Sequence, residues 1–228
     1  RCCRWSPRCL APLLALALTL ALATSGVAAL FGRYRYHARL DGAASSLDLG
    51  FGRRGTPVGF DAERVGAIKT DVEIELHLMV ENPIPIIEAW QKYVPTFKRA
   101  IIHAEMHRPT GAVTGYIKDI LKLEVGVALN PESPLKEIEE VLHQIDQLTI
   151  MSVHPGRQGQ TFGDAEHGGN ITSILEKIAQ ARAHRPDLVI EVDGGVTAEL
   201  IPALVKAGAN RLCVGGAIFK SDDPTGTL

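Results

Sequence analysis

Cysteine is scarce in this sequence, and a strong net charge of either sign is absent. The chain of 228 residues has four cysteines: Cys2, Cys3 and Cys9 crowd the N-terminal end, and Cys213 lies alone in an apolar run. That spacing favours neither a disulfide framework nor a zinc module, so the redox compartment stays open and a reducing one is favoured. We expect the cytoplasm, and the N-terminal apolar segment leaves a secreted or membrane-anchored protein open. The formal net charge of −2 provides no basic field for nucleic acid. A small-molecule partner is therefore expected.

The longest apolar run lies at the N-terminal end, from Leu10 to Ala23, and is open to three interpretations. Arginines at positions 1, 4 and 8 precede it, in the order typical of a secretory signal. Extended to Phe31, the run is almost long enough to cross a bilayer. It is equally consistent with non-native sequence, such as wrongly joined coding sequence. Residues 1–31 form a first segment, and we expect membrane contact only if residues 10–31 are a genuine anchor.

The second segment, residues 32–70, carries little regular patterning. It is rich in glycine and arginine, and we find neither a helical nor a strand period in it. We interpret it as loop or loosely ordered chain, in the place of a degenerate first part of the fold. From Asp71 onward the pattern changes, and residues 71–228 form the main domain.

Short apolar strands and amphipathic helices alternate through this domain. Asn82 and Pro83 open its first helix, and Thr197 is expected to cap its last. A cap is also expected at the helix that begins at Ser133. The expected strands are 72–80, 99–103, 124–129, 148–153, 188–192 and 210–214, and the expected helices are 83–94, 110–123, 133–143, 170–184 and 197–206.

Six such units in a row predict an α/β fold with right-handed parallel crossovers. A doubly wound sheet would place a glycine-rich phosphate loop after its first strand, whereas a barrel binds phosphate after its last strands. The glycine-rich turns of this chain follow the last three strands. The pattern therefore predicts a TIM-type (β/α)8 barrel.

Three glycine turns at strand ends are candidate phosphate-binding elements. Glycine lets backbone N–H groups approach an anion closely, and a nest of such groups binds phosphate without a cationic side chain. For any one turn, glycine that merely bends the chain is the better explanation, but three converging turns favour phosphate. The candidates are Gly156, Gly159 and Gln160 in the first turn, Gly194 and Gly195 in the second, and Gly215 and Gly216 in the third.

Polar residues at strand ends are candidate metal ligands. His77 lies in the first clear strand and Asp193 ends the fifth, so both can point into the barrel mouth. A neutral imidazole and a carboxylate together suit a divalent metal, although a lone strand histidine is more often a hydrogen-bonded core residue. His103, which ends the next strand, is a candidate third polar group. Met79 and Met151 are expected in the core, where they could also cover a bound sugar.

Six short strings of residues follow one another through residues 71–224. They are His77-Leu-Met-Val80, His103-Ala-Glu105, Gly126-Val-Ala-Leu-Asn-Pro131, Met151-Ser-Val-His-Pro-Gly156 with Gly159-Gln160, Val192-Asp-Gly-Gly195 and Gly216-Ala-Ile-Phe219. Each string alone is a weak signal. Together, in this order and spacing, they resemble the ribulose-phosphate 3-epimerase family.

The resemblance implies a (β/α)8 barrel and an isomerase that interconverts ribulose 5-phosphate and xylulose 5-phosphate. In that family two aspartates exchange the C3 proton on opposite faces of the sugar, while a divalent metal stabilises the enediolate. By resemblance, His77 and Asp193 are metal ligands and Asp193 is also catalytic. Zinc is the expected metal, with iron, manganese or cobalt as alternatives. Met79 and Met151 would cover the enediolate, and the three glycine turns would hold the phosphate.

The resemblance fails at the second strand, where the family supplies two further ligands and its second aspartate from a His-x-Asp-x-Met-Asp-Gly segment. His37 and Asp41 are a faint echo of that segment, with Arg39 where an aspartate ligand is expected. The chain also ends nine residues after Phe219, too soon for an eighth helix. We therefore expect a barrel that is incomplete or atypical in its first two units and lacks its last helix.

The missing aspartate matters because one carboxylate cannot easily remove a proton from one face of a sugar and return one to the other. One hypothesis is that the chain binds phosphosugar but epimerises it slowly or not at all. Two alternatives to a pentulose-phosphate epimerase stay open: an epimerase of a hexulose 6-phosphate, and a non-catalytic phosphosugar-binding protein tethered by residues 10–31. Association into a homo-oligomer is also left open.

Overall fold

The structure is a computed structural model that describes residues 62–67, 73–155, 160–163, 170–219 and 222. For residues 17–21 and 35–41, and for positions 216 and 219, it describes the backbone alone.

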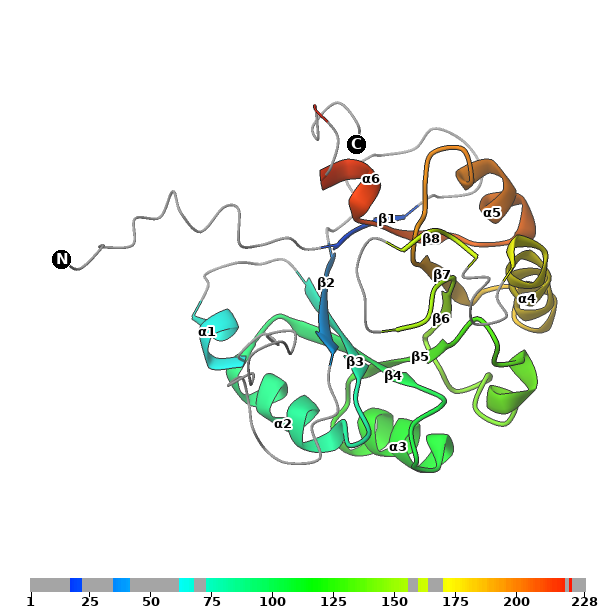
Figure 1. Cartoon of the computed structure of the whole chain (residues 1–228). Coiled ribbons are helices and arrows are strands. Elements are labelled where there is room, and N and C mark those ends of the chain that lie inside the picture. Colours follow the sequence, from blue (N-terminus) through cyan, green and yellow to red (C-terminus); the bar gives the residue numbers. More distant parts are fainter. Residues whose placement is uncertain are drawn as a thin grey trace.

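Eight strands close into a barrel in chain order (Figure 1). β2 to β8 run parallel, each paired with the next, whereas β1 runs antiparallel to both of its neighbours, β2 and β8. The predicted barrel is thus confirmed, and its first strand is atypical in direction. The strands are β1 Ala17–Ala21, β2 Arg35–Asp41, β3 Glu73–Met79, β4 Phe97–His103, β5 Glu124–Leu129, β6 Gln147–Met151, β7 Val189–Asp193 and β8 Arg211–Val214.

Helices lie outside the strands, on the outer surface of the barrel (Figure 1). α3 continues without interruption into a π-helical turn, and only a 3-10 turn stands between β5 and β6. The helices are α1 Ala62–Gly66, α2 Ile84–Tyr93, α3 Thr110–Gly115, the π-helix η2 Tyr116–Ile120, the 3-10 helix η3 Leu135–Ile138, α4 Ile171–His184, α5 Ile201–Ala207 and α6 Gly216–Phe219.

Three expectations about the elements were wrong. The segment 133–143 is not a capped α-helix: Pro134 is extended, and the N–H groups of Glu137, Glu139 and Val141 bond to carbonyls three residues earlier, as in a 3-10 helix. α5 begins at Ile201, with Leu200 and not Thr197 at the N-cap position. Pro202 explains this start, since proline is favoured in a first helical turn.

The third error concerns the segment 32–70, which was interpreted as loop. It contains β2, Arg35–Asp41, and α1, Ala62–Gly66. Tyr36, Ala38 and Leu40 do alternate with polar residues, which is the period of a strand.

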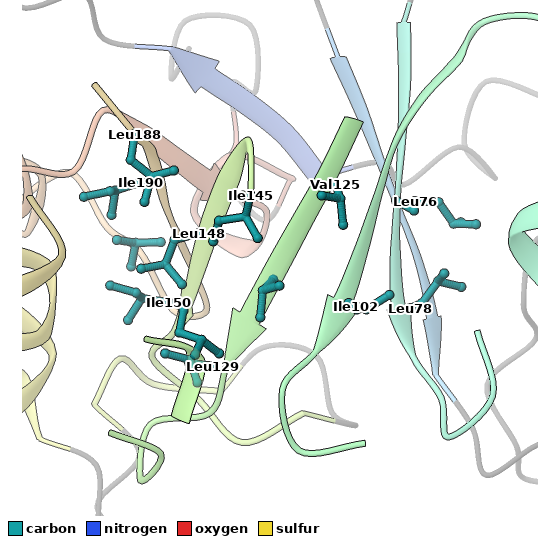
Figure 2. Packing of buried hydrophobic residues seen from close by; sticks show 14 of the residues in the cluster. Leu76, Leu78, Ile102, Val125, Leu129, Ile145, Leu148, Ile150, Leu188 and Ile190 are labelled. Atoms are coloured by element: carbon teal, nitrogen blue, oxygen red, sulfur yellow. The ribbon is translucent and has the colours of Figure 1, made fainter. Parts of the chain in front are cut away.

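Each parallel strand has two faces of different chemistry. Alternate residues such as Leu76, Ile102 and Ile190 are fully buried in one apolar cluster with helix residues such as Trp90 and Ile178. Figure 2 shows this outer layer of aliphatic side chains along β3 to β7. The intervening residues face the barrel interior, and many of them are polar. The helices are therefore held by the apolar layer, which leaves the interior free to carry charge.

Candidate functional site

The carboxyl ends of β3 and β7 bring two of the predicted ligands together. Nδ1 of His77 lies 3.7 Å from Oδ2 of Asp193, a distance too long for a hydrogen bond. The His77 side chain is fully buried, whereas 13% of the Asp193 side chain is exposed. A carboxylate thus lies at the mouth of the barrel with a buried imidazole beside it.

His103, at the end of β4, lies against His77. The two rings are stacked with centroids 4.9 Å apart, and their Nε2 atoms share a hydrogen bond of 2.8 Å. The other ring nitrogen of His103, Nδ1, lies 3.3 Å from Oε2 of Glu105. The structure therefore places the predicted third polar group in direct contact with His77 and not with Asp193.

Glu105 is a site residue that sequence reasoning missed, although it belongs to one of the quoted strings. Its Oε1 accepts a hydrogen bond of 2.7 Å from the backbone N–H of Asn130. Burial opposes its ionisation, but hydrogen bonds with His103, Ser133 and Asn130 outweigh burial and hold the pKa of Glu105 below its usual value. Glu105 is therefore a carboxylate anion at neutral pH.

Two of the predicted glycine turns pack against each other. Gly194 and Gly195 have φ values of +119° and +55°, a region that favours glycine. A Cβ at Gly195 would lie 2.4 Å from the backbone nitrogen of Phe162. The hydroxyl of Ser152, which follows β6, donates a hydrogen bond to the carbonyl of Gly194. The turn after β7 thus fits tightly against the turn after β6, with no space for side chains.

The remaining residues of the predicted phosphate-binding turns differ in their surroundings. Nε2 of Gln160 donates a hydrogen bond of 2.8 Å to the carbonyl of His154 and so braces the first turn. A Cβ at Gly215 would meet nothing within 4 Å. Gly156 and Gly159 lie outside the described residues, and Gly216 begins α6.

The two methionines differ in their surroundings. Met151, the last residue of β6, is fully buried. Met79, the last residue of β3, is half-buried. Met79 therefore lies nearer to solvent at the mouth than Met151 does.

His37 and Asp41 lie in β2, where the backbone alone is described. The register of β2 and β3 puts Asp41 beside Met79, Arg39 beside His77 and His37 beside Glu75. Asp41 is thus at the mouth end of its strand, whereas His37 is four residues deeper.

A network of charged and amide side chains fills the interior nearer the amino ends of the strands. Glu75 accepts hydrogen bonds from Arg99, at 3.2 Å, and from Arg211, at 2.9 Å. The side-chain oxygen of Gln147 accepts from both arginines, and its amide donates to Glu191 at 3.1 Å. Each of the five is more than nine-tenths buried. Because buried charges need partners, this network ties β3, β4, β6, β7 and β8 together below the mouth.

The sequence of the chain matches known proteins. A family model described as the ribulose-phosphate 3 epimerase family matches residues 58–219, which is most of the chain. The chain belongs to the ribulose-phosphate 3-epimerase family. The family predicted from the sequence is confirmed, and so is the class of enzyme, since the relatives are named as epimerases.

Individual members of the epimerase family match a similar share of this chain. The ribulose-phosphate 3-epimerase of Bacillus subtilis is 35% identical over 164 residues, which cover 68% of this chain and 68% of that protein. The chloroplastic ribulose-5-phosphate-3-epimerase of Arabidopsis thaliana is 34% identical over 165 residues, covering 68% of this chain and 53% of that protein. Against ribulose-phosphate 3-epimerase 1 of Cupriavidus necator the covered share of the relative is 63%. The matched part of this chain thus spans about half to two thirds of these relatives.

A solved structure supports the fold of the epimerase-family chain independently. The crystal structure of 3-hexulose-6-phosphate synthase superimposes with a TM-score of 0.53 at 19% identity, covering 73% of this chain and 76% of that one. At this identity the likeness shows the fold alone. Within the described part of the chain, no helix is both long and apolar enough to cross a membrane.

The donor atoms at the mouth of this epimerase-family barrel suit a divalent metal in type. Zinc bonds to histidine and carboxylate of about 2.0–2.2 Å put two donors of one ion roughly 3–3.5 Å apart. The 3.7 Å between Nδ1 of His77 and Oδ2 of Asp193 is close to that range. Among the residues with described side chains, no three His, Cys, Asp or Glu side chains gather into a metal-binding group. His77 and Asp193 therefore fit a metal ion as two of its donors. Further donors would come from residues whose side chains are not described, or from the substrate or water.

Replacing Gly195 with alanine should destabilise the mouth. The alanine Cβ would collide with the backbone of Phe162 and the residue would keep an unfavourable φ, so we expect the free energy of unfolding to fall by about 1–3 kcal/mol. Gly215→Ala is the matched control, because its Cβ would stand in open space. Urea unfolding of both variants tests this, and equal midpoints for the two would contradict it.

Proposed function

We propose that the chain interconverts ribulose 5-phosphate and xylulose 5-phosphate by exchanging the proton at C3. The observation that carries the proposal is the largely buried carboxylate of Asp193 at the mouth of the barrel, beside the imidazole of His77. The names of the relatives support the same substrate class. In a barrel of this kind, catalysis takes place at this end of the strands.

The chemistry needs a base that is held still and kept from bulk water. The C3–H bond is weakened by the neighbouring carbonyl at C2. In our proposal the Asp193 carboxylate takes the C3 proton, and the electron pair of that bond moves through C2 to the carbonyl oxygen, which gives an enediolate. Return of a proton to the opposite face of C3 then inverts that centre. Partial burial of Asp193 keeps the proton transfer to its carboxylate away from bulk water.

Inversion needs an acid on the other side of the sugar, and we propose Asp41 for this role. The β-strand register places Asp41 beside Met79, at the mouth end of β2. In the closed barrel, β1 and β8 separate β2 from β7 on one side and β3 to β6 on the other. Asp41 and Asp193 therefore belong to strands on different sides of the mouth, as two-sided proton exchange requires.

We also propose that His77 and Asp193 hold a divalent metal, with zinc expected first and iron, manganese or cobalt as alternatives. When bound, such an ion would stabilise the negative charge of the enediolate oxygens. His77 supplies a buried nitrogen donor and Asp193 a carboxylate donor, 3.7 Å apart. This separation and the chemistry of the donors are what support the proposal.

The phosphate group of the substrate is proposed to lie over the turns after β6, β7 and β8. The positive φ values of Gly194 and Gly195 turn the backbone sharply at this place, and Gly215 has open space above it. Because glycine carries no side chain of its own, backbone N–H groups in such turns can approach an anion closely. The net charge of −2 gives no reason to expect nucleic acid as a partner, and we propose that the chain acts in the cytoplasm.

One observation favours a second candidate, a phosphosugar-binding protein without turnover. The register puts Arg39 beside His77, at the position where the sequence resemblance leads us to expect an aspartate ligand. A chain of this kind would bind the sugar but not exchange its proton.

Comparison of substrates by NMR separates these possibilities. The purified chain is incubated with ribulose 5-phosphate and, separately, with a hexulose 6-phosphate, and the sugars are followed over time. We expect xylulose 5-phosphate to form much faster than the hexulose 6-phosphate is epimerised. Faster conversion of the hexulose 6-phosphate would identify it, and not ribulose 5-phosphate, as the substrate. Binding of both sugars without conversion would favour the second candidate.

A further inference from the structure

A row of neighbouring polar groups extends from Asp193 of β7 through β3 and β4 to the loop that follows β4. It runs from Asp193 to His77, from His77 to His103, and from His103 to Glu105. The two histidines are both more than nine-tenths buried. Glu105 stands at the other end of the row from Asp193, just beyond the carboxyl end of β4, and the proposed reaction gives it no direct part.

The direction of each hydrogen bond in this row follows from its far end. A backbone N–H can only donate, so Oε1 of Glu105 is an acceptor toward Asn130. The other carboxylate oxygen also accepts, and Nδ1 of His103 must therefore carry the proton that it shares with Glu105. A neutral imidazole has one N–H, which leaves Nε2 of His103 as an acceptor.

The same rule then determines His77. Because Nε2 of His103 accepts, Nε2 of His77 must donate across the 2.8 Å contact. The remaining nitrogen of His77, Nδ1, then bears a lone pair on the side where Asp193 lies. A proton that is fixed by Glu105 thus decides what His77 presents to the mouth, two residues away along the row.

We propose that Glu105 and His103 are positioning residues that set the tautomer of His77, so that its Nδ1 lone pair faces the mouth. This inference rests on the proposed function, in which His77 is a metal ligand. A ligand nitrogen needs a lone pair that points toward the metal. Outer partners that hold a ligand histidine in one tautomer are a general feature of metal sites. Here the outer partner is His103, whose own tautomer is set by the Glu105 carboxylate.

The surroundings of Glu105 support a fixed carboxylate at this end. Its ionised form is favoured by the hydrogen bonds with His103, Ser133 and Asn130, which lower its pKa against the effect of burial. Lys177 of α4 adds a positive charge nearby. Nζ of Lys177 also donates to the carbonyls of Asn130 and Pro131, at 2.8 and 3.0 Å, and so holds the loop whose N–H binds Glu105.

Glu105→Gln should reverse the whole row without a large change of shape. The Asn130 N–H requires the amide oxygen of the glutamine, which turns the NH2 group toward His103. Nδ1 of His103 must then accept, Nε2 of His103 must donate to His77, and Nδ1 of His77 gains the proton. His77 would thus present an N–H group to Asp193 in place of a lone pair.

Histidine tautomers can be measured directly in the metal-free protein. Long-range 1H–15N NMR of protein labelled with 15N-histidine, at pH 8 where imidazoles are ordinarily neutral, distinguishes the protonated ring nitrogen. We expect His77 to be protonated at Nε2 in the unmodified chain and at Nδ1 in Glu105→Gln. Zinc affinity, measured by calorimetry, should fall by about 10–100-fold in the variant.

Glu132→Gln is the matched control. Glu132 is an exposed carboxylate that also acts on Lys177 but pairs with His154, at 3.5 Å, and has no contact with the row. It should leave both the tautomer and the zinc affinity unchanged. An unmodified chain with His77 protonated at Nδ1 overturns the inference even if the variant does not fold, and so does an unchanged tautomer in Glu105→Gln. Expected tautomers in a chain that does not epimerise would instead count against the proposed function alone.

Discussion

Asp193→Asn should lower the rate of epimerisation by about 10²–10⁴-fold, the usual contribution of a general base. Asparagine keeps the size of the side chain but cannot accept the C3 proton. The surroundings of Asp193 should persist, because the backbone of β7 and its contacts with Ser152 do not depend on the carboxylate. The measurement is the initial rate of conversion of ribulose 5-phosphate, together with a circular dichroism spectrum to show that the barrel is intact.

Two further variants show whether a loss of activity is specific to the proposed proton-transfer residues. Asp119→Asn removes an exposed carboxylate from the π-helix on the outer surface and should leave the rate unchanged. Asp41→Asn should abolish epimerisation yet allow one of the two epimers to exchange its C3 proton with solvent, because Asp193 still serves that face. A rate for Asp193→Asn within a few-fold of the unmodified chain would exclude Asp193 as the base.

Glu75→Gln should be the most destabilising of the conservative changes considered. Glu75 is 1% exposed and accepts hydrogen bonds from two buried arginines, Arg99 and Arg211. Glutamine fills the same space but leaves two guanidinium groups with less compensating charge. Loss of one member of a buried ion pair costs about 3–5 kcal/mol. We expect a decrease of that size in the free energy of unfolding, measured by urea denaturation.

The control for this prediction is an exposed ion pair. Glu81 binds His107 on the surface, so Glu81→Gln should shift the unfolding midpoint very little. If Glu75→Gln were no less stable than Glu81→Gln, the interior network would not contribute to the stability of the barrel.

The sequence predicts the barrel well because its outer layer follows a simple rule. Leu76, Ile102 and Ile190 recur at alternate positions of short strands that are separated by helices, and this pattern favours parallel units. The expected ends of strands β3 to β8 therefore agree with the observed ends to within two residues. The same rule applies to β2, where Tyr36, Ala38 and Leu40 alternate with polar residues, but the arginines in and around that strand obscure the pattern.

The interior network could not be predicted in this way. An alternation of polar and apolar residues is usual for strands with one face in water, so Glu75 and Glu191 alone suggest a solvated face. In a closed barrel that face is buried too, and its charges must find partners. The partners of Glu75 are 24 and 136 residues away along the chain, which no local pattern reveals.

The candidate site was predictable in part, for a related reason. His77 and Asp193 stand at strand ends, where parallel strands bring side chains together, and the structure does place them side by side. The role of Glu105 depends instead on the loop after β5, which folds back so that the N–H of Asn130 meets its carboxylate. Local sequence does not show that contact.

In the proposed reaction, the mouth of this barrel exchanges the proton at C3 of a pentulose phosphate. The most direct test is to incubate the unmodified chain with ribulose 5-phosphate in D2O and to follow the C3 position by 1H NMR. We predict that the C3 proton signal is lost as xylulose 5-phosphate deuterated at C3 appears. A chain that binds the sugar, as shown by calorimetry, but leaves its C3 proton in place would contradict that proposal.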